Sequence, residues 1–219
     1  MSQTILLLLF NATLATVYMV TLASIIATLV GLPLGIILYV TRKGRLLEHR
    51  FTHQLLAALV NITRSIPFVI LMIAVIPFTR FIVGSSIGTN AAIVPLSFCA
   101  MPFIARVVEN ALLEVNHGLI EAAVSMGATA WQVILKVLLP EALPSIVAGL
   151  TLTVISLIGY SAMAGAVGGG GLGDVAIRYG YQRFDIRVML FTIIIMIILV
   201  QVIQFLGDKI LVKLSRSKK

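Results

Sequence analysis

The sequence predicts an all-α membrane protein with five spanning helices. Its 219 residues are 60% hydrophobic and only 11% charged, and the mean hydropathy is +1.11. Soluble domains average about 45–50% apolar and about 25% charged residues, so this chain has too few polar side chains to cover a surface in water. Apolar runs that reach the ~20 residues needed to cross a bilayer recur along its length.

The predicted spans are residues 12–40, 55–83, 90–112, 141–164 and 186–208. The first would be about 44 Å long if straight, at ~1.5 Å per residue. We expect it to tilt, to bend near Gly31, Pro33 and Gly35, or to project from the bilayer. Two short spans within residues 1–40 are a less favoured alternative, because no turn-forming polar cluster divides this stretch. We interpret residues 1–219 as a single transmembrane domain.

The first apolar segment is expected to stay in the protein as a spanning helix. A signal peptide would begin with a basic region and continue with an apolar stretch of about 7–15 residues. Residues 1–4 contain no basic side chain, and no Lys, Arg, Asp or Glu precedes Arg42. The apolar run behind them is also much longer than a signal peptide requires.

The basic residues of the connecting segments predict the orientation. Cytoplasmic loops carry an excess of Lys and Arg. Ten of these residues fall on one predicted side and four on the other: Arg42, Lys43, Arg45, Arg50, Lys136, Lys209, Lys213, Arg216, Lys218 and Lys219 against Arg80, Arg178, Arg183 and Arg187. The first side is therefore expected to be cytoplasmic, with the N-terminus outside and the C-terminus inside. This topology leaves a long cytoplasmic loop at 113–140 and a glycine-rich external loop at 165–185.

The cytoplasmic loop predicts two short helices at an angle, lying along the membrane surface. Residues 119–126 favour a helix, and Gly127 supplies its stop. Thr129 is a suitable cap for a second helix, whose apolar face would be Val133, Ile134, Val137 and Leu138 before Pro140.

The first of these two helices has the features of a docking element. Ala122 and Ala123 would give it a flat face for a partner, and Glu121 would lie in the first turn, where the helix dipole favours negative charge. An ordinary interfacial helix explains the same residues equally well on local physics alone.

Glu121-Ala122-Ala123, Gly127 and Val137-Leu138-Leu139-Pro140 together resemble the EAA loop of ABC importer permeases, with Val137 where isoleucine is usual. That resemblance implies a type I importer fold in which residues 121–127, including Ser125 and Met126, form a coupling helix that docks on an ATPase subunit. Segments 64–68, 76–80, 102–114, 159–163 and 170–173 are similar to the methionine importer permeases in particular. Membership would imply a bacterial inner-membrane complex of two copies of this chain, two ATPase subunits and an extracytoplasmic methionine-binding lipoprotein.

A translocation pathway is predicted beside the small residues that end the fourth span. Small side chains let helices approach closely in lipid, so residues 159–173 are candidates for a dimer axis and gate, with Tyr160, Ser161 and Met163 lining the path. Plain helix packing beside a flexible loop explains them equally well. Arg64 lies in the cytoplasmic half of the second span, where a charge indicates function. We expect it to steady the gate beside Ser65 and Pro67, or to reach the interface by snorkelling.

Other reactive side chains are interpreted as structural. Arg106 and Glu109 have the i, i+3 spacing of a helix-face ion pair. His49 and His53 have the i, i+4 spacing of some metal pairs, but a solvated interfacial face is favoured. Cys99 is expected to be a small buried hydrophobe. We expect no metal, cofactor or catalytic residue, and the glycine run lacks the Lys-Ser/Thr of a phosphate loop. The net charge of +8 is attributed to lipid contact and not to nucleic acid.

Three alternatives to a methionine importer remain open. One is a secondary transporter that works without ATP, although no inverted repeat is evident. Another is a structural or sensory membrane subunit. The third keeps the ATP-driven importer but changes its cargo to another amino acid, an osmolyte or a phosphonate, because an EAA loop carries no information about cargo.

Overall fold

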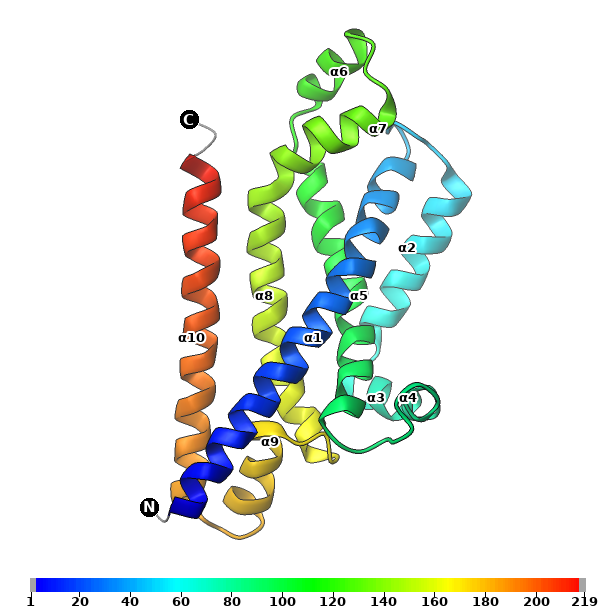
Figure 1. Ribbon diagram of the computed structural model, residues 1–219. Helices are drawn as coiled ribbons and strands as arrows, with labels where there is room; N and C mark the ends of the chain where they lie inside the picture. Colours follow the sequence, from blue (N-terminus) through cyan, green and yellow to red (C-terminus); the bar gives the residue numbers. More distant parts are fainter. Residues whose placement is uncertain (1–2, 217–219) are drawn as a thin grey trace.

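The computed structural model describes residues 3–216 as an elongated helical bundle (Figure 1). The predicted basic residues Lys218 and Lys219 lie outside the described residues. In chain order the helical segments are α1 (Gln3–Thr41), α2 (Arg50–Ser65), α3 (Phe68–Ala74), α4 (Ile76–Val83), α5 (Thr89–Leu113), α6 (His117–Ser125), α7 (Ala130–Val133), the π-helix η1 (Ile134–Leu138), α8 (Leu139–Ala166), α9 (Gly171–Val175), the π-helix η2 (Ala176–Tyr181) and α10 (Ile186–Arg216).

Most of the predicted spans are present as helices. Within residues 3–216, four helical segments are long and apolar enough to cross a membrane: Gln3–Thr41, Thr89–Leu113, Ala130–Ala166 and Ile186–Leu214. A fifth span is reached only if the bent pair α2 and α3 counts as one. The chain is therefore an all-helical protein with four or five candidate spans.

The prediction of one continuous second span at 55–83 was wrong. Helices α2 and α3 meet at an angle of 106°, and α4 follows as a separate short helix. The break lies at Ile66, whose backbone is extended with φ −81° and ψ 125°. Pro67 explains the break, because its ring disfavours a helical conformation in the residue before it.

The first helix is longer than predicted and is not divided. It runs without interruption from Gln3 to Thr41, so the alternative of two short spans is wrong. Gly31 and Gly35 serve close packing against α5. A Cβ atom at Gly35 would lie 2.5 Å from the Ala105 carbonyl oxygen and 2.6 Å from Val108 Cβ. This spacing of small residues allows two helices to approach closely inside a membrane.

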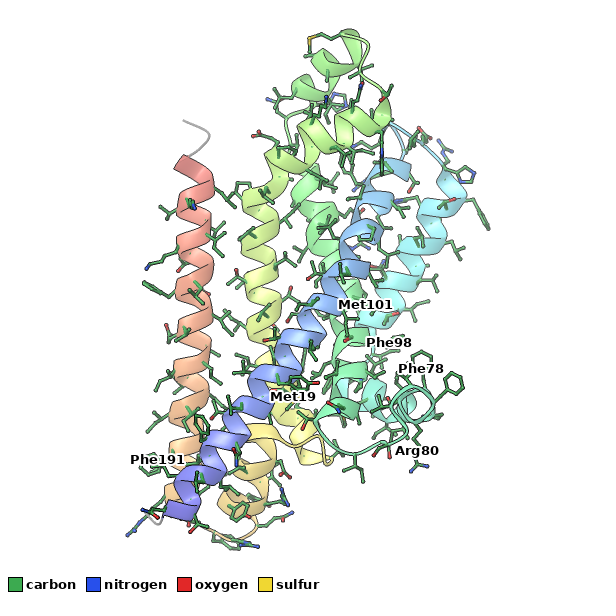
Figure 2. All side chains as sticks on the ribbon, viewed as in Figure 1. Met19, Phe78, Arg80, Phe98, Met101 and Phe191 are labelled. Atoms are coloured by element: carbon green, nitrogen blue, oxygen red, sulfur yellow. The ribbon has the colours of Figure 1, made fainter. Side chains whose placement is uncertain are left out.

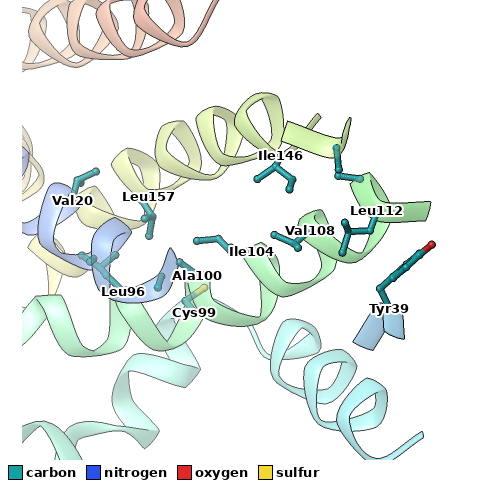
Figure 3. Packing of buried hydrophobic residues seen from close by; sticks show 14 of the residues in the cluster. Val20, Tyr39, Leu96, Cys99, Ala100, Ile104, Val108, Leu112, Ile146 and Leu157 are labelled. Carbon is teal, nitrogen blue, oxygen red and sulfur yellow. The ribbon is translucent and has the colours of Figure 1, made fainter. Parts of the chain in front are cut away.

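The core lies mainly between α1, α5 and α8. Helices α1 and α5 share the most extensive contact in the protein. Figure 3 shows Ile104 and Val108 of α5 opposite Leu157 and Ile146 of α8, and Val20 of α1 belongs to the same cluster. All five side chains are buried. At the other side of α5, Phe78 of α4 contacts Phe98 edge-on, with ring centroids 5.2 Å apart (Figure 2).

The predicted external loop at 165–185 is more ordered than expected. It contains α9 and η2, and α9 packs against both α8 and α1. The backbone N–H of Leu172 donates a hydrogen bond to Thr16 Oγ1 at 2.8 Å, which ties the start of α9 to the first span. The glycines make this fold possible, because a Cβ at Gly173 would collide with the Ala162 backbone. The structure thus favours intrasubunit helix packing for this part of the glycine run.

The two ends of the bundle differ in the number of Lys and Arg residues that they carry. The C-terminal ends of α1 and α10, the start of α2, and α6 lie at one end, and the N-terminus, α4, α9 and η2 lie at the other (Figure 1). Arg80 projects from the second end, as Figure 2 shows. The chain termini therefore lie at opposite ends, and the more basic end is the one that carries α6.

Candidate functional site

Helix α6 projects from the basic end of the bundle, and its limits are fixed by capping. Asn116 Oδ1 accepts a hydrogen bond from the Gly118 backbone N–H at 2.9 Å at the start. At the end, Gly127 has φ +80°. The Gly127 N–H donates a hydrogen bond to the Val124 carbonyl at 2.9 Å, and the Ala128 N–H donates one to the Ala123 carbonyl at 3.1 Å. This pattern is a Schellman motif, so the predicted helix stop at Gly127 is confirmed.

The segment after Gly127 was predicted only in part. Thr129 caps α7 as expected, and Thr129 and Gln132 form a reciprocal capping box. Three members of the predicted apolar face, Val133, Ile134 and Leu138, are buried. However, the second helix is not a separate short helix that ends before Pro140. It continues without a gap through η1 into α8, and Pro140 lies at the junction directly after the π-helical segment.

Helix α6 rests on the bundle through one side and exposes the other. Ile120 and Ala123 are buried in the main core cluster, whereas Ala122, Ser125 and Met126 are exposed. The prediction that both alanines face a partner was therefore wrong for Ala123. It lies three residues after Ile120 on the same helix face, where its small side chain lets α6 approach its own bundle. The Met126 side chain, 82% exposed, extends the free surface.

Glu121 lies on the free part of α6, but not in its first turn. The helix begins at His117, so Glu121 is in the second turn and the predicted effect of the helix dipole does not apply. Its Oε1 atom lies 3.0 Å from Nδ1 of His117, and both side chains are more than half exposed. Such an exposed pair contributes little to stability, which leaves the carboxylate available to a partner.

A cleft of about 440 Å³ separates α6 from the end of α1 and the loop that follows it. Its lining includes Tyr39, Arg45 and Glu121. The Arg45 guanidinium lies 4.8 Å from the centre of the Tyr39 ring, and the buried Tyr39 hydroxyl has no hydrogen-bond partner within the described residues. The backbone N–H of Gly44 donates to Glu48 and lowers the pKa of that carboxyl. Sequence reasoning missed this cleft, because it joins segments about eighty positions apart.

The residues predicted to steady a gate lie at the break between α2 and α3. Arg64 and Ser65 end α2, and Pro67 precedes α3. The Arg64 guanidinium lies 4.8 Å from the centre of the Phe103 ring on α5. Arg64 is about 21 Å along α2 from Arg50, at ~1.5 Å per residue, so its side chain does not reach the start of α2. Snorkelling to a membrane interface stays a prediction.

The predicted pathway residues of α8 differ in their surroundings. Tyr160 stacks on Phe68 of α3, with ring centroids 5.0 Å apart. Met163 is 48% exposed. Ser161, in contrast, is buried and donates a hydrogen bond to the Ile158 carbonyl of its own helix at 2.7 Å. The structure thus brings Tyr160 near the α2–α3 break, and a pathway role for these three residues stays a prediction.

An ionic cluster joins three helices near α6. The predicted pair of Arg106 and Glu109 is confirmed, and Glu109 is only 1% exposed. The structure adds Asn61 of α2, whose Oδ1 accepts a hydrogen bond from Arg106 at 2.7 Å, and Arg42, whose guanidinium lies 3.9 Å from Glu109. Local spacing predicted only the pair on α5, because the other two groups come from distant segments.

The remaining reactive side chains have structural partners. His49 caps α2 by accepting a hydrogen bond from the Thr52 backbone N–H, and His53 Nδ1 lies 3.0 Å from the Leu38 carbonyl oxygen. Cys99 is buried in the core, as predicted. No cluster of three or more metal-ligating side chains occurs within residues 3–216.

Similar proteins match nearly the whole of this chain. A probable D-methionine transport system permease protein, MetI, of Vibrio cholerae is 58% identical over 201 residues, which cover 92% of this chain and 89% of the relative. The corresponding protein of Pasteurella multocida is 53% identical over 197 residues, covering 90% and 91%. An inward-facing structure of the MetNI methionine ABC transporter contains a chain that superposes with TM-score 0.96 at 50% identity, covering 98% and 99%.

The family model for binding-protein-dependent transport system inner membrane components matches residues 31–217. This range includes the α2–α3 break, the ionic cluster, α6 and the α8 segment with Tyr160. It therefore spans all the candidate sites described above, and the N-terminal part of α1 lies outside it. The chain belongs to the family of inner membrane components of binding-protein-dependent transport systems.

Proposed function

We propose that this chain is the permease subunit of an ATP-driven methionine importer in the bacterial inner membrane. The observation that carries this proposal is the agreement with the MetNI methionine transporter over almost the full length of both chains, at 50% identity and TM-score 0.96. Two relatives that are 58% and 53% identical to this chain are probable D-methionine transport system permeases. The chain is a membrane component, and ATP hydrolysis belongs to a separate ATPase subunit.

The mechanism assigned to this chain is alternating access driven from α6. The exposed side of α6, with Glu121, Ala122, Ser125 and Met126, is the docking surface for the ATPase. Movement of the ATPase passes through the buried contacts of Ile120 and Ala123 into the bundle. Such transfer requires a rigid attachment, and the capping at both ends of α6 supplies it.

The orientation follows from this assignment. With α6 inside the cell, the N-terminus lies outside and the C-terminus inside. The excess of basic residues at the α6 end supports that orientation. The full complex would contain a second copy of this chain, two ATPase subunits and an extracytoplasmic methionine-binding lipoprotein, with lipid around the spans. Residues 1–219 would act as one transmembrane domain.

The pathway is assigned to the region where the α2–α3 break meets α8. Arg64, Ser65 and Pro67 approach it from one side, and Tyr160 and Met163 from the other. The stacked rings of Phe68 and Tyr160 support this assignment, because they connect the break to α8. Ser161 would support the helix from within and would not contact cargo directly.

The test is reconstitution of the permease with its ATPase and binding protein in liposomes, followed by uptake of radiolabelled methionine. Uptake should require ATP and should be competed by unlabelled methionine more strongly than by other amino acids. An ATPase variant that binds but does not hydrolyse ATP is the matched control. Uptake by the permease alone under an ion gradient would favour a secondary transporter. If an osmolyte or a phosphonate competed more strongly than methionine, the cargo would be assigned to that class of compound.

A further inference from the structure

A small cavity lies between α5 and α8 at the level of the α2–α3 break. Its volume is about 210 Å³, which equals the liquid volume of about seven water molecules. The cavity therefore has room for one small organic molecule. Its lining is mostly apolar and includes Phe103, Val107, Leu152, Leu157 and Tyr160.

The break in the second span places a positive charge against one wall of this cavity. Arg64 lies two residues before the extended Ile66, and its guanidinium lies over the Phe103 ring that forms part of the cavity wall. Among the described residues, the ion pairs are formed by Arg42, Arg50, Arg106, His117 and Arg178, so Arg64 has no carboxylate within ion-pair distance. An unpaired charge within a membrane segment is costly and marks a functional site.

Two hydroxyl groups complete the polar side of the cavity. Thr153 Oγ1 donates to the Gly149 carbonyl at 2.8 Å, and Ser156 Oγ donates to the Leu152 carbonyl at 2.9 Å. Because each hydroxyl uses its proton within the helix, its oxygen keeps lone pairs that accept hydrogen bonds from a ligand. Both residues line the cavity.

We propose that this cavity is a binding site for a zwitterionic amino acid within the spans, with Arg64 pairing its α-carboxylate. Thr153 and Ser156 accept from its ammonium group, and Leu152, Leu157 and Tyr160 enclose an apolar side chain. A thioether suits this wall, because sulfur makes favourable contacts with aromatic rings. Binding sites at interrupted helices are a recurring feature of transporters. The inference rests on the proposed function, since it assigns a place to the cargo.

The experiment uses the intact permease–ATPase complex in lipid nanodiscs and a methionine analogue with a photoreactive diazirine in its side chain. After illumination, mass spectrometry maps the labelled peptides. The label should appear on the segments of α5 and α8 that line the cavity. Methionine should compete for it, and methionine methyl ester, which lacks the carboxylate, should compete poorly. Labelling confined to other segments, or equal competition by the ester, would overturn the assignment.

Variants of Arg64 test the carboxylate contact. A hydrogen bond to a charged group contributes about 1.5–3 kcal/mol, so Arg64→Gln should reduce labelling about tenfold or more. Arg64→Lys should retain part of it. Arg80→Gln, at the far end of the bundle beside Ser86, is the matched control and should label as the wild type does. Unchanged labelling in Arg64→Gln would refute the pairing.

A second variant covers the possibility that Arg64→Gln fails to assemble with the ATPase. Ser156→Phe fills the cavity from an exposed position on α8, and it should abolish cavity labelling while the complex still co-purifies. Persistent labelling of the cavity segments in that variant would contradict the site. Uptake by the wild-type complex separates the two proposals: if methionine is transported and the cavity is never labelled, this inference fails and the importer assignment stands. If methionine is not transported, the importer assignment fails.

Discussion

The substitution Glu109→Gln removes a buried negative charge from the point where α1, α2 and α5 meet. Glu109 is 1% exposed and pairs with Arg106, which is 22% exposed. Arg42 lies at the edge of the same cluster. Because glutamine has nearly the same shape, the change leaves the packing intact and tests the charge alone. Helix α5 leads directly into the segment that carries α6, so this cluster supports the base of the proposed coupling helix.

The expected cost follows from the burial of the two partners. Removing one member of a buried ion pair typically costs about 3–5 kcal/mol. Arg106 is partly exposed and keeps its hydrogen bond to Asn61, so we expect a loss of about 3 kcal/mol, at the lower end of the range for buried pairs. For a chain of this size, that loss corresponds to a decrease in Tm of roughly 6–12 °C.

The reactivity of the Cys99 thiol provides the assay of thermal unfolding for Glu109→Gln. Cys99 is the only cysteine in the sequence, and its thiol is buried in the core. A dye that becomes fluorescent on reaction with thiols therefore reports thermal unfolding of the detergent-purified permease. The control is a double-mutant cycle with Arg106→Gln, which should give a smaller loss in the double variant than the sum of the two single losses. A Tm within about 2 °C of the wild type for Glu109→Gln, well below the expected shift, or strict additivity, would refute the reasoning.

Four further substitutions test other parts of the structure. Glu121→Lys reverses the charge on the free side of α6; it should leave the protein in the membrane and abolish ATP-driven uptake, and wild-type uptake by the variant would refute the docking role. Met163→Ala should alter the kinetics of uptake, or its inhibition by substrate, more than it alters assembly, and unchanged kinetics across methionine analogues would count against a pathway position. Gly35→Val would push α1 away from Val108 and should lower the Tm by several degrees, since overpacking typically costs about 1–3 kcal/mol. An unchanged Tm for this variant would show that α1 does not pack tightly there. Gly84→Val, at a position with open space but positive φ, should lower the Tm through backbone strain alone.

The sequence by itself determined the class of the protein and the position of most of its helices. Runs of apolar residues predict spans regardless of tertiary context, because a helix satisfies all its backbone hydrogen bonds internally in lipid. Local signals were equally sufficient for the end of α6, where Gly127 permits positive φ, and for the capping box at Thr129. The spaced residues of the EAA loop indicated the permease family, which the comparison confirmed.

The predicted second span was wrong because an apolar composition does not show whether a segment continues straight or turns. Residues 55–83 are mostly apolar, yet the chain turns by 106° at Pro67. A proline within an apolar segment can be tolerated or can break the helix, as the continuous helix through Pro33 and the break at Pro67 show. The difference depends on whether neighbouring segments stabilise the bent conformation, and Phe68 finds such support on Tyr160.

Only the tertiary structure decided which side chains of the candidate sites are exposed and which face the core. Ala122 and Ala123 are identical in type and adjacent in α6, but Ala122 is exposed and Ala123 is buried between α6 and the rest of the bundle. The cavity beside Arg64 likewise depends on contacts between α2, α5 and α8. These contacts join residues far apart in the chain, and their geometry arises from packing of the whole bundle, which no local pattern of residues encodes.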